Sequence, residues 1–166
     1  REGVRRIRPA AVEASLRTIL ADLKTSIDIE VDDAIQLLEA MWRGVRDSWH
    51  LEDVPWDATD PANENRHSKL VDKASLVAVT EFLVQRLNLQ AEEGLDVTNL
   101  DQVQQYCQRV MQGIPSRFWV MKWNEKQLDT SAGRGMIRQS LASIRTAVSS
   151  NADSPLDEAI LVSQSE

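Results

Sequence analysis

Residues 34–49 read AIQLLEAMWRGVRDSW, and this stretch decides the fold class. Its apolar side chains recur at spacings of three and four, the period of an amphipathic α-helix. They are Ala34, Ile35, Leu38, Met41, Trp42, Val45 and Trp49. Acidic residues crowd the start of the segment, where the helix dipole favours negative charge; they are Asp28, Glu30, Asp32 and Asp33. The pattern predicts a helix whose apolar face, with both tryptophans on it, belongs to the core.

The helical period continues on both sides of this segment. A first helix is predicted from Pro9, which suits the first helical position, with apolar residues recurring as far as Ile27. A third is predicted from about residue 70 to residue 87. A fourth is expected to begin after a cap at Thr98 or Asn99 and to end at Gly113. A fifth runs from 131–135 to residue 148, and a last short helix follows Ser154-Pro155.

The remaining stretches do not carry this period. A polar loop is predicted from His50 to Asn65, where Pro55 and Pro61 disfavour helix. For 116–129 the pattern fits a short strand and a helical turn equally well. No alternation of strands with helices suggests a parallel sheet. The sequence therefore predicts an all-α fold, a compact bundle of about five or six amphipathic helices forming one domain over 9–162, with a frayed tail at 163–166.

Composition and charge exclude several classes of protein. The 166 residues include 19 Lys or Arg and 26 Asp or Glu, a net charge of −7, which argues against a chain that is basic throughout. No apolar run approaches the length of a membrane span. The chain starts without Met or an apolar signal core, so we expect a piece of a longer protein. The single cysteine, Cys107, indicates a reducing compartment, the cytoplasm, and lies on an apolar helix face where inert packing is expected.

The charge is distributed unevenly along the chain. Residues 1–8 contain four Arg and one Glu, and form either a basic arm or the end of a linker. Residues 113–146 contain six basic and two acidic side chains, interleaved with tryptophans. These candidate nucleic-acid-binding residues are Arg117, Trp119, Lys122, Trp123, Lys126, Arg134, Arg138 and Arg145. Basic groups beside stackable rings are typical of single-strand sites. The alternative places both tryptophans in the core and the arginines on a solvated or salt-bridged helix face.

One glycine-rich turn, at residues 131–135, begins a predicted helix. Its backbone N–H groups, assisted by Arg134, could hold a phosphate. However, the turn lacks the Gly-Lys-Ser/Thr ending of a nucleotide-binding loop. A plain turn with Thr130 or Ser131 as N-cap is the preferred interpretation.

Catalytic and metal-binding patterns are sparse. The two histidines, His50 and His67, flank the polar loop, but no zinc-ligand spacing accompanies them. Neighbouring acidic pairs such as Asp32-Asp33 point about 100° apart on a helix and do not form a catalytic dyad. No nucleophile motif is present. We expect no metal and no cofactor, and enzymatic activity within these residues is disfavoured.

The order of features between Ala34 and Gln85 follows a recognisable plan. A helix centred on Trp42 precedes an acidic loop with Trp49 and Trp56, and then Ser68-Lys69-Leu70-Val71 leads into a helix with Ala74, Val77 and Ala78. This order resembles the helical region downstream of the sheet domain in DGQHR-domain proteins, the DndB-like relatives associated with bacterial DNA phosphorothioation and phage defence. The naming motif, Asp-Gly-Gln-His-Arg, is absent. The resemblance covers 34–85 and implies a helical portion of a DNA-associated regulator.

These observations lead to one expected function and two alternatives. The expectation is a non-catalytic helical interaction domain of a larger cytoplasmic bacterial regulator, contacting a protein partner or a second copy, with no membrane contact. The first alternative is a nucleic-acid-binding module that uses the basic 113–146 segment. The second is the helical part of an enzyme whose catalytic motif lies outside this chain.

Overall fold

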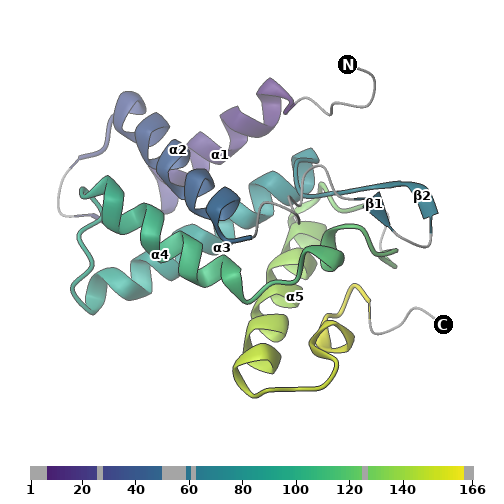
Figure 1. Ribbon diagram of the computed structural model, residues 1–166. Coiled ribbons are helices and arrows are strands. Elements are labelled where there is room, and N and C mark those ends of the chain that lie inside the picture. Colours follow the sequence, from purple (N-terminus) through teal and green to yellow (C-terminus); the bar gives the residue numbers. More distant parts are fainter. Residues whose placement is uncertain (1–6, 26–27, 50–58, 61–62, 125–126, 163–166) are drawn as a thin grey trace.

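Five α-helices make up most of the described chain (Figure 1). The structure, a computed structural model, describes residues 7–25, 28–49, 59–60, 63–124 and 127–162. The helices are α1 (Pro9–Asp22), α2 (Val31–Asp47), α3 (Lys73–Glu92), α4 (Leu100–Gln112) and α5 (Ser131–Ser149). Two short 3-10 helices, η2 (Ser116–Trp119) and η3 (Pro155–Glu158), follow α4 and α5. The predicted all-α helical bundle is confirmed. None of the described helices is both long and apolar enough to cross a membrane.

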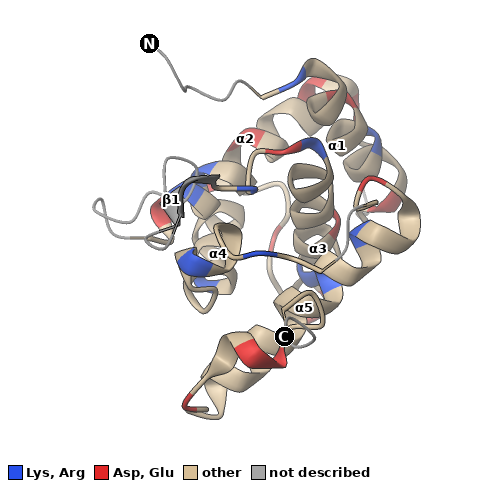
Figure 2. Ribbon diagram, turned by 90° about the vertical axis from the view of Figure 1, so that its right-hand side faces the viewer, with Lys and Arg blue, Asp and Glu red and all other residues tan. Residues whose placement is uncertain are grey.

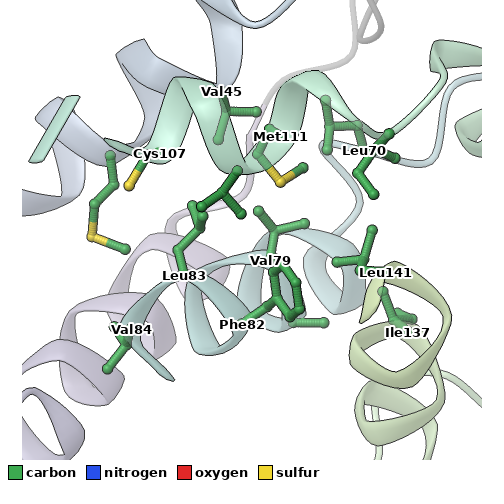
Figure 3. Packing of buried hydrophobic residues seen from close by; sticks show 14 of the residues in the cluster. Val45, Leu70, Val79, Phe82, Leu83, Val84, Cys107, Met111, Ile137 and Leu141 are labelled. Atoms are coloured by element: carbon green, nitrogen blue, oxygen red, sulfur yellow. The ribbon is translucent and has the colours of Figure 1, made fainter. Parts of the chain in front are cut away.

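The central helix is α3, which contacts each of the other four α-helices. Figure 3 shows Val79 of α3 lying between Met111 of α4 and Leu141 of α5. All three side chains are fully buried. Each such side chain contributes about 1.5–3 kcal/mol relative to an exposed one. The shared core is therefore the main source of stability, and α3 holds α4 and α5 next to each other.

Helices α2 and α4 pack closely because α2 carries a glycine at their crossing. A Cβ at Gly44 would lie 2.4 Å from the carbonyl oxygen of Gln104 and 2.9 Å from Cβ of Cys107. At its start, α2 has a capping box, in which the backbone N–H of Glu30 donates to the carboxylate of Asp33 at 3.1 Å. The predicted role of acidic residues at this helix start is confirmed.

The two tryptophans of the α2 segment lie at the rim of the core. Trp42 and Trp49 are partly buried, and both pack against the core cluster. The indole N–H of Trp42 donates to Oγ1 of Thr80 at 3.1 Å, and that of Trp49 to the carbonyl of Ile114 at 2.9 Å. The predicted stripe is wrong at Ile35, which is 39% exposed.

Other predicted boundaries also need correction. The first helix ends at Asp22 rather than continuing to Ile27, which lies outside the described residues. Part of the predicted polar loop forms a small antiparallel hairpin of β1 (Thr59–Asp60) and β2 (Asn63–His67). Its strands are polar, so they lack the alternating pattern that reveals a strand. The last short helix is a single 3-10 turn, η3. Of the ambiguous stretch 116–129, residues 116–119 form a second 3-10 turn, η2, which favours the helical-turn alternative there.

Candidate functional site

The tryptophans predicted to stack on nucleic acid belong to the core. Phe118, Trp119 and Trp123 form an aromatic cluster with ring centroids 5.0–5.9 Å apart. Trp119 is 0% exposed and Trp123 is 6% exposed, and the indole N–H of Trp123 donates to the Phe118 carbonyl at 2.9 Å. Stacking on a base needs an open ring face. The alternative of core packing is therefore confirmed, and a stacking role for these two tryptophans stays a prediction that their burial disfavours.

The segment before α3 fastens onto this aromatic cluster. The backbone N–H of Lys69 donates to the Trp119 carbonyl at 2.9 Å, and its ammonium group lies 5.1 Å from the Trp123 ring centroid. The same ammonium group donates to the carbonyl of Met121. Ser68 and Leu70 on either side are fully buried. The Ser68-Lys69-Leu70 sequence, which carries part of the family resemblance, thus joins the start of α3 to η2.

Two of the predicted basic residues are engaged in a salt bridge across the α3–α5 contact. Nε of Arg134 and Nη1 of Arg138 both lie 3.0 Å from Oε1 of Glu81. Their side chains are only 23% and 24% exposed. The predicted common face on α5 is confirmed, and it is salt-bridged at this end. Figure 2 accordingly shows basic and acidic segments interspersed over the helices.

The other predicted basic residues differ in their surroundings. Arg117 and Lys122 are exposed, and neither forms an ion pair with the described part of the chain. Lys126 lies outside the described residues. Arg145 is partly buried, two turns along α5 from Arg138, and belongs to a different group of charges.

The glycine-rich start of α5 is filled by the protein itself. Oγ1 of Thr130 accepts a hydrogen bond from the backbone N–H of Gly133 at 3.0 Å, so Thr130 is the N-cap. A Cβ at Gly133 would lie 2.3 Å from the carbonyl oxygen of Gln127 and 2.6 Å from Cα of Leu128. The plain-turn interpretation is confirmed at Thr130, whose hydroxyl takes up one of the backbone N–H groups at the helix start.

The charges of three arginines from three helices act on Tyr106, and we call these residues the arginine cluster: Arg86 of α3, Arg109 of α4 and Arg145 of α5. The Tyr106 hydroxyl donates to the carbonyl of Arg86 at 3.3 Å, and the Arg109 guanidinium lies 5.8 Å from the Tyr106 ring centroid. Tyr106, Arg109 and Gly113 share one face of α4 because they are three and four residues apart. Arg145 reaches this face, with its Cγ 3.8 Å from the position of a Cβ at Gly113.

Within the described residues, the arginine cluster has no neutralising carboxylate. None of its three guanidinium groups forms an ion pair among the residues that the structure describes. Burial, and then the nearby charge of Arg86, lower the pKa of Arg145. Burial raises the pKa of Tyr106, and the charges of the three arginines oppose that shift. Like charges held together in a partly buried place are unfavourable, so the site suits an added anion.

Sequence reasoning found only one of these three arginines. Arg145 can be singled out from the sequence because it lies in the basic 113–146 segment, whereas Arg86 and Arg109 lie in the acidic part of the chain. Arg86, Arg109 and Arg145 come near Tyr106 only because α3, α4 and α5 pack together. A count of charges along the sequence does not reveal that packing. The one available signal was the shared α4 face of Tyr106 and Arg109.

A groove of about 640 Å³ opens beside the arginine cluster. It is lined by Asp47, Ser48, Trp49, Gln108, Gln112, Gly113, Ile114, Pro115, Ser116, Arg117 and Val148. Two of these residues lie near Arg145: Gly113, where a Cβ would be 3.8 Å from Cγ of Arg145, and Val148, three residues further along α5. The groove's carboxylate, that of Asp47, is bonded to Nε of Arg46 at 2.9 Å. Arg86, Arg109 and Arg145 are not among the residues that line the groove.

Groups capable of covalent or metal chemistry are not gathered at this surface. Cys107 is fully buried in the core, and burial raises the pKa of its thiol. Inert packing of this thiol is therefore confirmed, because the thiolate is the reactive form. Across the described residues no three His, Cys, Asp or Glu side chains come together as a metal site. His50 and the side chain of His67 lie outside what the structure describes.

Comparisons of this chain with protein-family models, with curated proteins and with solved structures find no match. The resemblance of residues 34–85 to DGQHR-domain proteins stays a prediction.

Proposed function

We propose that this chain is a non-catalytic interaction domain that docks an anionic segment of a partner protein on the arginine cluster. The observation that carries the proposal is that Arg86, Arg109 and Arg145, from three helices, all act on Tyr106 and form no ion pair in the described part of the chain. The wider setting is a bacterial DNA-associated regulator of the DNA-modification or phage-defence type, in the cytoplasm. That setting is supported by the resemblance of 34–85 alone.

Two arginines on the same helix, α5, differ in whether a carboxylate balances their charge. On α5, Arg138 shares the Glu81 carboxylate with Arg134, so the fold neutralises these guanidinium groups itself. The neighbouring charges that act on Arg145, on the same helix, are those of Arg86 and Tyr106, and Arg145 forms no ion pair among the described residues. Guanidinium groups bind carboxylates and phosphates through paired hydrogen bonds in a fixed fork. A cluster that the fold leaves uncompensated is a binding surface whose counter-charge comes from a partner.

The nucleic-acid alternative is supported by two exposed cations, Arg117 and Lys122, together with Arg145. The remaining described residues of the predicted patch are buried or salt-bridged. A duplex presents a continuous line of phosphates, and its affinity depends on how many are neutralised together. Because the chain carries a net charge of −7, this alternative is the weaker one.

A titration of labelled anions separates these functions. Fluorescence anisotropy would follow a fluorescein-labelled Glu-rich peptide, a single-stranded and a double-stranded oligonucleotide at low and high salt. The proposal expects peptide binding at low salt that falls about tenfold or more in Arg145→Ala or Arg109→Ala. Arg43→Ala, which removes the same charge from an exposed position on α2, is the control and should bind as the parent does.

Three results would contradict the proposal. The first is no binding of the peptide at low salt, and the second is an equal loss in Arg43→Ala, which would indicate a general charge effect. In the third, the oligonucleotides bind more tightly than the peptide and respond to Arg117→Ala and Lys122→Ala, which would favour the nucleic-acid alternative.

A further inference from the structure

The groove at the C-terminal ends of α2 and α4 is a second surface, lined by none of the three arginines of the cluster. We infer that this groove binds the C-terminal end of a partner protein. The free carboxylate of that peptide pairs with Arg117, and its last apolar side chains pack against Trp49 and Pro115. The inference goes beyond the proposed function and does not depend on the arginine cluster.

One charged group of the groove is left unpaired by the fold. Among the described residues, two charged ones line the groove, Asp47 and Arg117. Both carboxylate oxygens of Asp47 are engaged, since Oδ1 lies 2.9 Å from Nε of Arg46 and Oδ2 accepts from the amide of Gln104 at 3.2 Å. The exposed Arg117 side chain forms no ion pair or hydrogen bond with the described part of the chain. The groove is therefore complementary to one anionic group, and Arg117 is the residue that binds it.

Backbone acceptors line the groove together with Arg117. The last carbonyl groups of a helix have no partner within that helix. Those of Gln112 and Gly113, where α4 ends, accept no hydrogen bond among the described residues. Pro115, which follows shortly, has no N–H to offer them. The groove thus combines acceptors for the amide N–H groups of a peptide with a single guanidinium group.

This combination favours a terminal carboxylate over an acidic side chain. In a C-terminal residue the carboxylate and the amide N–H are attached to one Cα, so their separation is nearly fixed. An Asp or Glu side chain carries its carboxylate on further rotatable bonds, whose ordering costs entropy. Capture of a C-terminal carboxylate at a backbone site is also a recurring form of peptide recognition.

The walls of the groove provide apolar contacts for the residues before the carboxylate. Trp49, Pro115 and Val148 line the groove, and each is only partly buried. The Trp49 ring is held in place, since its indole N–H donates to the Ile114 carbonyl at 2.9 Å. A wall that is already ordered loses little entropy on binding. The volume of about 640 Å³ is within the range of about 300–1,000 Å³ usual for ligand sites, and it suits a short peptide end.

The first experiment compares two forms of one peptide. The ¹⁵N-labelled full chain would be titrated with a hexapeptide of apolar residues as the free acid and, separately, as the C-terminal amide. The indole N–H signal of Trp49 reports on the groove, and that of Trp42, on α2 outside the groove, is the internal control. We expect the free acid to shift the Trp49 signal and to bind at least about tenfold more tightly than the amide, because only the acid forms a charge-assisted pair with Arg117. The Trp42 signal should stay in place.

Two pairs of variants assign the binding to residues of the groove. Arg117→Gln should weaken binding of the free acid about tenfold and leave the amide unchanged. Lys122→Gln, which removes the same charge from an exposed residue outside the groove, should affect neither peptide. Gln112→Glu, which places a carboxylate in the groove, should weaken the free acid several-fold more than Gln105→Glu, the same change two turns earlier on α4.

Four results would overturn parts of this inference or all of it. Equal affinity of the acid and the amide, or an equal loss in Lys122→Gln, would overturn the role of Arg117. An amidated hexapeptide with an internal Glu that binds as tightly as the free acid would overturn the choice of a peptide terminus. A 5′-phosphorylated trinucleotide that binds more tightly than the free acid, followed by the Trp49 signal, would overturn the choice of a protein partner. No saturable shift of Trp49 with any of these compounds would overturn the groove as a binding site.

Discussion

Arg138 and Arg145 lie on the same helix, but their charges have opposite consequences for the fold. Arg138 is 3.0 Å from the Glu81 carboxylate, whereas burial and the like charge of Arg86 lower the pKa of Arg145. The spacing of four and seven residues was enough to predict a common face for Arg134, Arg138 and Arg145. It was not enough to predict their partners, since Glu81 and Arg86 are more than fifty residues away in sequence and reach α5 only through packing.

At Gly44, a single hydrogen in place of a side chain determines how closely α2 approaches α4. Gly44→Ala should lower the free energy of unfolding by about 1–3 kcal/mol or more, because the new Cβ would lie 2.4 Å from the Gln104 carbonyl oxygen. Gly135→Ala is the matched control: its Cβ would meet only Nη2 of Arg138, at 3.5 Å. There the ordinary preference of a helix for Ala should stabilise the protein by up to about 1 kcal/mol. Urea denaturation measures both, and equal effects would refute the close-packing argument.

At the scale of elements, the helices that the sequence predicted are those with a strong apolar period. The helices α2, α4 and α5 were found near their observed bounds, and Asn99, one of two suggested caps, accepts from the Gln102 N–H at 3.2 Å. The element that was missed, the β1–β2 hairpin, is polar and has no apolar face to reveal it. Residues 116–119 are ambiguous in the sequence because η2 is a single turn whose two aromatic side chains, Phe118 and Trp119, are adjacent in sequence and both buried, so no apolar period can be recognised.

The two tryptophans of the aromatic cluster differ in the hydrogen bonding of their indole N–H groups, and this difference can be tested. The indole N–H of Trp123 donates to the Phe118 carbonyl, whereas that of the fully buried Trp119 has no partner. Replacing each by Phe removes a similar volume, so the difference reports the hydrogen bond. Trp123→Phe should cost about 1 kcal/mol more than Trp119→Phe in the free energy of unfolding. The opposite order in urea denaturation would mean that Trp119 forms the stronger interaction.

At the scale of the whole molecule, the net charge of −7 concealed how the positive charge is arranged. Counted along the sequence, basic residues are in excess in 113–146. In the folded protein, the side chains of that segment have different environments. Arg134 and Arg138 neutralise Glu81, both tryptophans enter the core, and Arg145 joins two arginines from the acidic part of the chain. The candidate site is therefore a product of the tertiary structure, and only one of its arginines was accessible to sequence reasoning.

The central claim is that the arginine cluster serves a partner and not the fold, and the stability of Arg145→Met tests it most directly. Met keeps the unbranched stem that packs by Gly113 and removes the charge. Urea denaturation at about 20 mM and about 500 mM salt would compare it with Arg138→Met, which breaks a salt bridge to Glu81. The account predicts that Arg145→Met unfolds with a higher free energy than the parent at low salt, by about 0.5–1 kcal/mol, with the gain shrinking at high salt, while Arg138→Met is destabilised. A loss of stability in Arg145→Met equal to that in Arg138→Met would contradict it.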